Sequence, residues 1–412
     1  MGLVCQGSLS LSGDLASARL NKTAMRFITG QVANVCLQTM RITNIRLTKE
    51  LWNLRKHIVF FIQNISLPAG SERVTSIIAN NLAEKGYDIT ILSICGNGTC
   101  YYPLNKKISI YTLIEQPDAD NRKLFLKILC RLARFYKNNK ADICIDVFAA
   151  LSIYTLILKK FFKFKNISWE HFNYNINTGM NKLGRKLACR FSDQIITLTE
   201  TDKKYYQDNN KINGKIDYIY NPSPYQVIRK IPEKDNFIIS IGRLTYQKGF
   251  DRLVDIWADI EDKTGCYLYI LGDGEEKNAL QAKINNKGLK QVKLLGNIKN
   301  VEEYYKKALF YVSSARYEGL PMTMIEAQSF GLPVISMDFD TGPRDIISNG
   351  TDGYIITGKD MRTVKNLFSK KILELLNDKE KLKLLNKNAL KAARRFSEEE
   401  IIKKWVHILE EL

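Results

Sequence analysis

The sequence predicts an α/β protein made of two doubly wound domains with a cleft between them. Three observations support this prediction. The chain has 412 residues, which is enough for two domains of ordinary size. Short apolar runs alternate with helical patterns along both halves, as is typical of parallel sheets covered by helices. This alternation is interrupted at Asn221-Pro222-Ser223-Pro224, where the prolines disfavour both helix and central strand, so we place a linker there.

We therefore expect a first domain over residues 56–222, a second over 223–395 and a final helix over 396–412. Residues 1–55 differ from the rest: up to Arg46 they are rich in Ser, Thr and Asn, with Asp14 as the only acid and no clean period. They lack the apolar core and cleavage site of a signal peptide, and their composition weakly resembles that of a transit peptide. We interpret them as a poorly ordered extension, or as the result of a start site assigned too far upstream.

Composition narrows the classes of protein and partner. The chain is 45% hydrophobic and 25% charged, as in a soluble globular protein, and its net charge is +19. That charge favours an acidic partner, which could be nucleic acid, an anionic membrane surface or an anionic substrate. The eight Cys form no Cys-x-x-Cys and there are only three His, so we expect reduced thiols in a cytosolic protein and no metal site. The longest uncharged apolar run, 147–158, is too short to span a bilayer.

The first half opens with the apolar run 57–62, which fits a buried parallel strand. A turn near Pro68 then opens a helix that runs to about Lys85, and a strand over 89–94 completes a βαβ unit. The elements expected after this unit are strands over 143–148, 165–169, 194–199 and 217–220, and helices over 121–139, 183–190 and from Asp202, with Thr201 as the cap of the last.

The helix expected over 121–139 is basic and amphipathic. Its apolar residues recur at helical spacing, and Lys and Arg supply the other side. Such a helix can lie on anionic lipid, or it can pack on the core with a solvated basic face. Both interpretations stay open from the sequence.

The second half repeats the alternation. A strand begins near residue 236 and ends in a Gly turn, after which 247–250 opens a helix. The elements expected next are strands over 267–271, 292–295 and 309–313, an edge strand over 354–356, and helices over 275–286, 301–307, 361–376 and 379–395. Ser397 with Glu400 three residues on forms a capping box, which starts the last helix.

Two carboxylates bracket a helix start within residues 313–347. Glu318 precedes a Gly-Leu-Pro turn, Pro321 suits the first helical position, and Glu326 follows about 7 Å further along the axis. The free N–H groups and the positive dipole end of such a helix favour an anion. Carboxylates on either side suit a ligand whose hydroxyls flank a phosphate, and a nucleotide sugar has this layout.

Residues 318–327, followed by Gly-Leu-Pro-Val-Ile at 331–335, resemble the donor-site signature of the retaining glycosyltransferases of family 4. Upstream, Arg243 and Lys248 stand in order as a second motif of this family. The resemblance covers about residues 57–412 and is strongest in the second half. It implies the GT-B fold, in which two Rossmann-like domains face a cleft, the donor lies on the second domain and the last helix crosses back to the first.

The resemblance also implies roles for particular residues. Glu318 would hold the hexose hydroxyls and Glu326 the ribose diol, while Arg243 and Lys248 would stabilise the departing diphosphate, so that losing either cation lowers turnover at least a hundredfold. His171, at the end of a first-half strand, would face the donor sugar, unless it is simply packed at a domain seam. The implied catalytic residues are His171, Arg243, Lys248 and Glu318, and the implied donor-binding residues are Gly70, Gly242, Arg243, Lys248, Gly272, Gly319, Leu320, Pro321, Met322 and Glu326. The family often has a Gly pair where this chain keeps Gly70 alone.

The function expected is a metal-independent retaining hexosyltransferase. It would take a nucleotide sugar, a UDP-sugar by expectation, as co-substrate with no separate cofactor. The acceptor would be a lipid-linked saccharide of a cell-surface polysaccharide, reached from the cytoplasm at the inner face of the membrane, with no nucleic-acid partner. Three alternatives remain: an NAD-dependent oxidoreductase, against which the missing Gly-x-Gly-x-x-Gly argues; a polyanion- or nucleic-acid-binding protein, suggested by the charge of +19; and a GT-B nucleotide-sugar epimerase or hydrolase.

Overall fold

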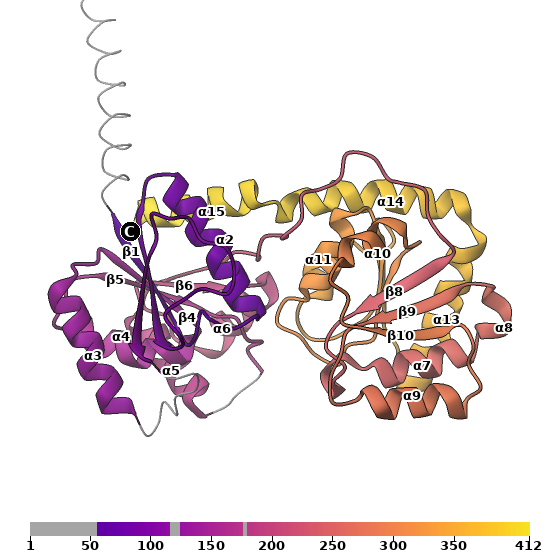
Figure 1. Cartoon of the computed structure of the whole chain (residues 1–412), viewed down its shortest axis with the longest axis horizontal. Helices are drawn as coiled ribbons and strands as arrows, with labels where there is room; N and C mark the ends of the chain where they lie inside the picture. Colours follow the sequence, from indigo (N-terminus) through magenta and orange to yellow (C-terminus); the bar gives the residue numbers. More distant parts are fainter. Residues whose placement is uncertain (1–55, 116–123, 176–178) are drawn as a thin grey trace, which may run out of the picture. The chain divides into compact units, whose positions relative to one another are not determined.

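A computed structural model describes residues 56–115, 124–175 and 179–412 (Figure 1). Residues 56–412 form one compact unit. The extension expected over 1–55 lies outside the described residues, as do the first three residues of the helix expected from Asn121.

The first half contains a seven-stranded parallel sheet in the order β3-β2-β1-β4-β5-β6-β7. Its inner strands are near-continuous apolar runs because helices cover both faces. The edge strand β3 was not predicted, and its outer residues alternate between exposed and half-buried. The strands are β1 (His57–Ile62), β2 (Asp88–Cys95), β3 (Ser109–Ile114), β4 (Ile143–Val147), β5 (Lys165–Trp169), β6 (Gln194–Thr197) and β7 (Lys215–Tyr218).

The helices of the first half are α2 (Gly70–Glu84), α3 (Phe125–Asn138), α4 (Ser152–Leu158), α5 (Gly179–Phe191) and α6 (Glu200–Asn209), with a 3-10 turn, η1 (Ala149–Leu151), before α4. The predicted cap of α6 was wrong by two residues. Thr199, not Thr201, accepts the hydrogen bond from the backbone N–H of Asp202, because β6 ends earlier than expected. The Thr201 hydroxyl instead donates to Asp345 at 3.0 Å.

The second half contains a six-stranded parallel sheet in the order β10-β9-β8-β11-β12-β13, with β13 at the edge as expected. Its strands are β8 (Phe237–Ile241), β9 (Tyr267–Leu271), β10 (Val292–Gly296), β11 (Tyr311–Ser313), β12 (Val334–Met337) and β13 (Gly353–Ile356). Its helices are η2 (Tyr246–Lys248), α7 (Phe250–Ala258), α8 (Glu261–Thr264), α9 (Lys277–Asn286), α10 (Val301–Lys307), α11 (Met322–Ser329), α12 (Pro343–Ile346), α13 (Met361–Asn377), α14 (Lys379–Ala393) and η3 (Arg394–Phe396).

Both sheets have the strand order of a doubly wound fold, which confirms the predicted fold class. In each sheet the order reverses at the first strand: β1 lies between β2 and β4, and β8 lies between β9 and β11. Ligands of such sheets bind outside the carboxyl ends of the strands at this switch point. The site is therefore expected where β8 ends.

The last helix, α15 (Glu398–Glu411), returns to the first sheet as predicted. Ser397 caps it by accepting from the backbone N–H of Glu400. Its buried Trp405 packs edge-on against Trp169 of β5, with ring centroids 4.9 Å apart. Among the described residues, no helix has both the length and the apolar character needed to cross a membrane.

Candidate functional site

A cavity of about 410 Å³ lies at the carboxyl ends of β8 and β9. It brings together three of the predicted donor-binding residues, Gly242, Arg243 and Gly272. Arg243 is exposed there. An added Cβ on Gly272 would stand 2.0 Å from the carbonyl oxygen of Gly242, so only glycine allows these two turns to touch. The remaining lining residues are Pro68, Ile241, Leu271, Asp273, Asn297, Ile298 and Val301.

Lys248 folds back over the same turn. Its Cε would be 3.0 Å from a Cβ added to Gly242, so a larger residue at 242 would crowd the lysine. The ammonium group forms an ion pair with the Glu318 carboxylate, and both side chains are largely buried. Burial alone would lower the pKa of Lys248, but Glu318, Tyr311 and Glu326 together raise it. The lysine is therefore held protonated beside the cavity.

The turn that carries Glu318 is held through its backbone. The Thr341 hydroxyl donates to the carbonyl oxygen of Glu318 at 2.7 Å, and the Asn173 amide donates to Thr341 Oγ1 at 2.7 Å. A Cβ on Gly319 would stand 2.8 Å from the carbonyl oxygen of His171, so the segment after β5 lies against this turn. Glycine at 319 is what permits that approach.

Glu326 projects from α11 into a buried polar cluster. The Tyr305 hydroxyl donates to its Oε2 at 2.9 Å, and Arg73 of α2 lies 3.9 Å from Oε1. Burial raises the pKa of Glu326, while Tyr305, Arg73 and Lys248 work in the opposite direction. Each carboxylate therefore has a different nearest cation: Lys248 for Glu318 and Arg73 for Glu326.

His171 lies two residues past β5 among aromatic rings. Its ring centroid is 4.2 Å from that of Trp169 and 5.2 Å from that of Phe148, and burial lowers its pKa to about 3. The imidazole is therefore neutral at physiological pH. Among the described residues its buried Nε2 has no hydrogen-bond partner. Phe148 itself has φ of 101°, a conformation that costs a non-glycine residue about 1–3 kcal/mol.

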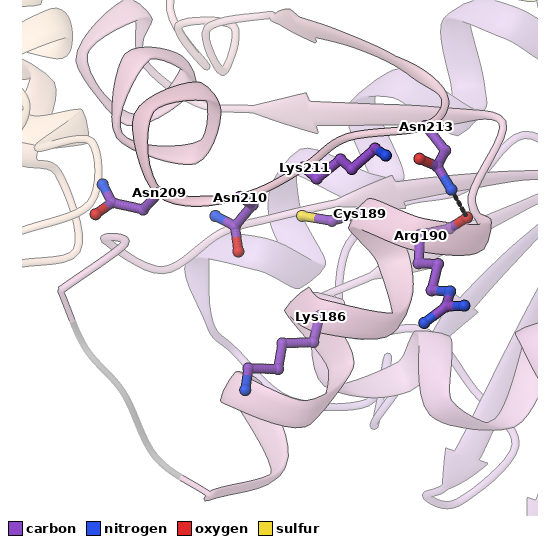
Figure 2. Close-up of a pocket in the computed structure, with 7 residues that line it drawn as sticks. All are labelled: Lys186, Cys189, Arg190, Asn209, Asn210, Lys211 and Asn213. Atoms are coloured by element: carbon purple, nitrogen blue, oxygen red, sulfur yellow. Dashed lines mark hydrogen bonds between the residues drawn. The ribbon is translucent and has the colours of Figure 1, made fainter.

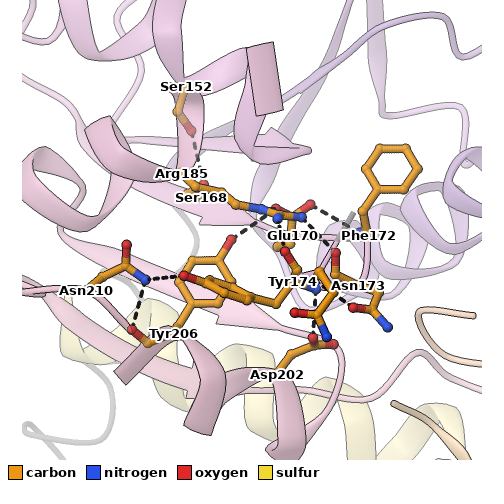
Figure 3. A network of polar contacts seen from close by, with 11 residues as sticks. Ser152, Ser168, Glu170, Phe172, Asn173, Tyr174, Arg185, Asp202, Tyr206 and Asn210 are labelled. Carbon is orange, nitrogen blue, oxygen red and sulfur yellow. Dashed lines mark hydrogen bonds and ion pairs between the residues drawn. The ribbon is translucent and has the colours of Figure 1, made fainter. Parts of the chain in front are cut away.

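A buried polar network holds the segment that follows β5 (Figure 3). The Glu170 carboxylate accepts from Arg185 Nε at 2.7 Å and from the Tyr206 hydroxyl at 3.0 Å. The Arg185 guanidinium also donates to the carbonyl oxygens of Asn173 and Tyr174. The buried pair of Glu170 and Arg185 therefore positions the backbone of residues 170–174. This segment includes His171 and Asn173, which lie against the turn of Glu318.

The other predicted donor-site residues flank this arrangement. Pro321 lies one position before α11 rather than inside it, Leu320 is buried, and Met322 begins α11 and packs against the core. Gly70 begins α2, two residues after Pro68 of the cavity, and a Cβ there would meet no atom within 4 Å. The conformation of Gly70 thus gives no steric reason for glycine.

Sequence reasoning missed several residues that contact the side chain of Glu326 or the backbone turn of Glu318. Tyr305 and Thr341 carry no local signal, because each lies in an ordinary helix or turn. Arg73 lies three residues after Gly70 and Asn173 two residues after His171, but nothing in the sequence pairs them with residues of the second half. These contacts exist only in the folded chain.

Comparisons with protein families match both halves. The family described as "Glycosyltransferase Family 4" matches residues 68–223, and the one described as "Glycosyl transferases group 1" matches residues 225–392. The amylovoran biosynthesis glycosyltransferase AmsD of Erwinia amylovora is 32% identical to the chain, over 85% of this chain and 99% of that protein. An alpha-1,4-N-acetyl-D-galactosaminyltransferase of Campylobacter jejuni, which acts on a PP-undecaprenol-linked saccharide according to its name, is 27% identical over 86% and 98%.

Solved structures show the same fold. The lipopolysaccharide outer core galactosyltransferase WaaB, in its apo form, superposes with a TM-score of 0.69 at 21% identity and covers 86% of this chain and 100% of that one. HepE of Anabaena in complex with UDP has a TM-score of 0.69 at 16% identity, with the same coverage of both chains. The predicted GT-B architecture is confirmed by these likenesses.

Proposed function

Since the chain belongs to the glycosyltransferases of family 4, we propose that it is a retaining enzyme that moves a hexose from a UDP-sugar to a hydroxyl of a lipid-linked saccharide. The observation that carries this proposal is the buried ion pair of Lys248 and Glu318 beside the cavity that holds Arg243. A protonated lysine, an exposed arginine and a carboxylate in one place suit a ligand that joins a diphosphate to a sugar.

Each of these residues is proposed to contact a different part of the donor. Arg243 offers a bidentate contact to the diphosphate and Lys248 a point charge, and both stabilise the charge that grows on the leaving group. Glu318 would exchange its contact with Lys248 for the hexose hydroxyls, and Glu326 would hold the ribose diol. These two cations supply the electrostatic stabilisation that a metal supplies in other transferases.

The chemical step is proposed to occur on one face of the sugar. The bond between the anomeric carbon and the diphosphate oxygen breaks, the acceptor oxygen bonds to the same face of that carbon, and the acceptor proton passes to the departing phosphate. His171 would face the sugar as a neutral imidazole, since burial keeps it unprotonated. Trapping of a covalent glycosyl-enzyme would contradict this mechanism.

The acceptor is inferred from the relatives. One is named for amylovoran biosynthesis, one for transfer onto a PP-undecaprenol-linked saccharide, and a third, of Salmonella typhimurium, is a lipopolysaccharide 1,6-galactosyltransferase 28% identical over 56% of this chain. The names refer to amylovoran, to a lipid-linked saccharide and to lipopolysaccharide. A role in cell-surface polysaccharide biosynthesis, at the cytoplasmic face of the membrane, follows by analogy.

A second candidate is favoured by the net charge of +19, which suits a polyanion-binding protein without catalysis. Such a protein would have no use for two carboxylates buried beside a cation-lined cavity. An epimerase or hydrolase of the same fold would use the donor site but not an acceptor, and analysis of the sugar product distinguishes it from a transferase.

Calorimetric titration with UDP, GDP and ADP, without added metal, tests the donor site. We expect UDP to bind and Glu326→Ala to weaken it about tenfold or more, because a buried charged partner of the ribose is lost. Glu302→Ala removes an exposed carboxylate paired with Lys306 on nearby α10 and should leave the affinity unchanged. Folded protein that binds no nucleotide would refute the transferase, and preference for GDP or ADP would refute the UDP assignment.

A further inference from the structure

Helix α5 carries two exposed stripes that the fold does not use. Leu183, Leu187 and Phe191 recur every four residues and form an apolar stripe on one side of the helix. Leu183 is 50% exposed and Phe191 45% exposed. The neighbouring stripe is basic, also with a spacing of four, and consists of Lys182, Lys186 and Arg190, all exposed.

The opposite side of α5 already provides its packing on the domain. A Cβ added to Gly184 would stand 2.1 Å from the carbonyl oxygen of Ala149, so the helix lies directly against η1. Ala188 and Cys189 are buried on the same side. The apolar stripe is therefore additional to what the core requires, and it remains in contact with solvent.

An apolar groove of about 550 Å³ lies between α4 and this stripe. Phe161, in the turn after α4, stands at the groove and is 76% exposed. Its neighbours Phe162 and Phe164 instead pack against Tyr136 of α3. The groove is lined by Ile153, Leu156, Ile157, Lys159, Lys160, Phe161, Leu187 and Phe191.

A basic cavity of about 490 Å³ adjoins the other stripe of α5 (Figure 2). Lys186 and Arg190 enter it from α5, and Lys211 from the segment after α6, together with the amides of Asn209, Asn210 and Asn213. Cations and amide donors without a carboxylate in the lining suit an anionic oxygen ligand such as a phosphate.

The charged residues of this face are mostly basic, and Asp193, just after α5, pairs with Lys159 and Lys165. Residues 152–192 contain eight Lys and Arg but a single acid, Glu170, which is buried and paired with Arg185. Helix α3 also presents exposed lysines and arginines and one strongly exposed apolar residue, Leu126, near its start, whereas its remaining Ile, Leu and Phe residues are buried or half-buried in the core. A large exposed apolar patch with a cationic rim requires a partner that is apolar and anionic at once.

We propose that the face formed by α4, the turn over 159–164 and α5 docks on an anionic lipid bilayer. Phe161, Leu183 and Phe191 enter the boundary between headgroups and acyl chains, while Lys160, Lys186 and Arg190 meet the lipid phosphates. The docking needs no residue of the donor site. It goes beyond the proposed function and would bring the enzyme to a lipid-linked acceptor.

Vesicle sedimentation of the full chain at low salt tests this face. We expect binding to phosphatidylcholine vesicles that contain about one-third phosphatidylglycerol, and much weaker binding to pure phosphatidylcholine. Lys186→Glu with Arg190→Glu should weaken it about 30-fold or more, and Phe161→Ser with Phe191→Ser about tenfold or more. The matched control, Leu384→Ser with Lys387→Glu, alters an exposed leucine and lysine on α14 and should change nothing.

UDP titration of each variant separates this proposal from the donor site, because the docking variants should bind UDP as the parent does. Three results would overturn the docking face: no binding to anionic vesicles, equal binding to neutral ones, or binding that the face variants and the α14 control lower alike. Light scattering adds a fourth. A dimer that Phe161→Ser with Phe191→Ser dissociates would identify a second copy of the chain as the partner.

Discussion

The Lys248–Glu318 contact, like the Arg185–Glu170 pair, differs in burial from the exposed ion pairs of the chain. Pairs such as Lys403–Glu399 are exposed and contribute about 0–1 kcal/mol each. Lys248 and Glu318 are largely buried, where desolvation of both charges offsets most of their attraction. A buried pair is therefore poor evidence for stability, and its place beside the cavity argues for a role in binding.

His171 should make the free energy of unfolding depend on pH. Its pKa is about 3 in the folded state and about 6.5 when unfolded, so the unfolded chain binds the proton more readily below pH 6.5. The stabilisation from a neutral His171 is thus fully present above about pH 6.5 and is lost as the pH falls toward 3, by at most about 1.4 kcal/mol per unit.

Urea unfolding of the parent and of His171→Gln between pH 4 and 8 measures this dependence. The difference in unfolding free energy between the two proteins should shrink as the pH falls, because glutamine does not titrate. Burial raises the pKa of both Asp146 and Asp202 to about 6, but these residues are common to the two proteins, so their contributions cancel in the difference. A difference that stays constant over this range would show that His171 is not held neutral by the fold.

The local structure around the proposed donor-site residues was predictable where a local pattern exists. Glu318, Gly319 and Glu326 follow one strand-turn-helix unit, and the strand, the turn and the helix were all found. Their partners were not predictable, because Arg73 and Glu326 are 253 positions apart and meet only once both sheets are formed. Pattern and propensity act over a few residues, whereas such contacts depend on topology.

At the scale of elements, the segment between β5 and α5 depends on helices that follow it in sequence. Arg185 of α5 and Tyr206 of α6 both bind Glu170, and Tyr174 N–H donates to Asp202 of α6 at 2.9 Å. Most strands and helices were predicted, but the edge strand β3 and the short helix α8 were not. The cap of α6 was misplaced because two threonines, 199 and 201, both suit an N-cap, and only the end of β6 decides between them.

Arg185→Met should lower the unfolding free energy by about 3–5 kcal/mol, because it leaves the Glu170 carboxylate buried without its cation. Combining it with Glu170→Gln should recover much of the loss, since the uncompensated charge is then gone. Denaturant unfolding measures both. Lys203→Met, which removes the exposed pair with Asp217, serves as the control and should cost less than about 1 kcal/mol. Equal losses from Arg185→Met and Lys203→Met would contradict the positioning role.

At the scale of the whole molecule, residues of the first half meet one stretch of the second. Asn173 and Thr201 contact Thr341 and Asp345, and α15 carries the end of the chain back to β5 and α2. The return of α15 was predictable from the family resemblance and its capping box, but the residue that fixes α15 to the first sheet was not. Trp405 is one of several apolar residues of α15, and only the structure shows that it packs on Trp169.

Trp405→Ala should cost about 3–5 kcal/mol, and so should Trp257→Ala, because both indoles are fully buried. The two substitutions should destabilise different parts of the chain. Trp405 packs against β5 and its helix contacts α2, whereas Trp257 lies in the separate core under α7 and α13. Hydrogen exchange should therefore speed up in β5 and α2 for Trp405→Ala and in α7 and α13 for Trp257→Ala, while His407→Ala, on the exposed face of α15, should change neither. Since Trp169 also packs against His171, loss of Trp405 should in addition weaken donor binding. Faster exchange in α7 and α13 alone for Trp405→Ala would show that α15 does not hold the first sheet.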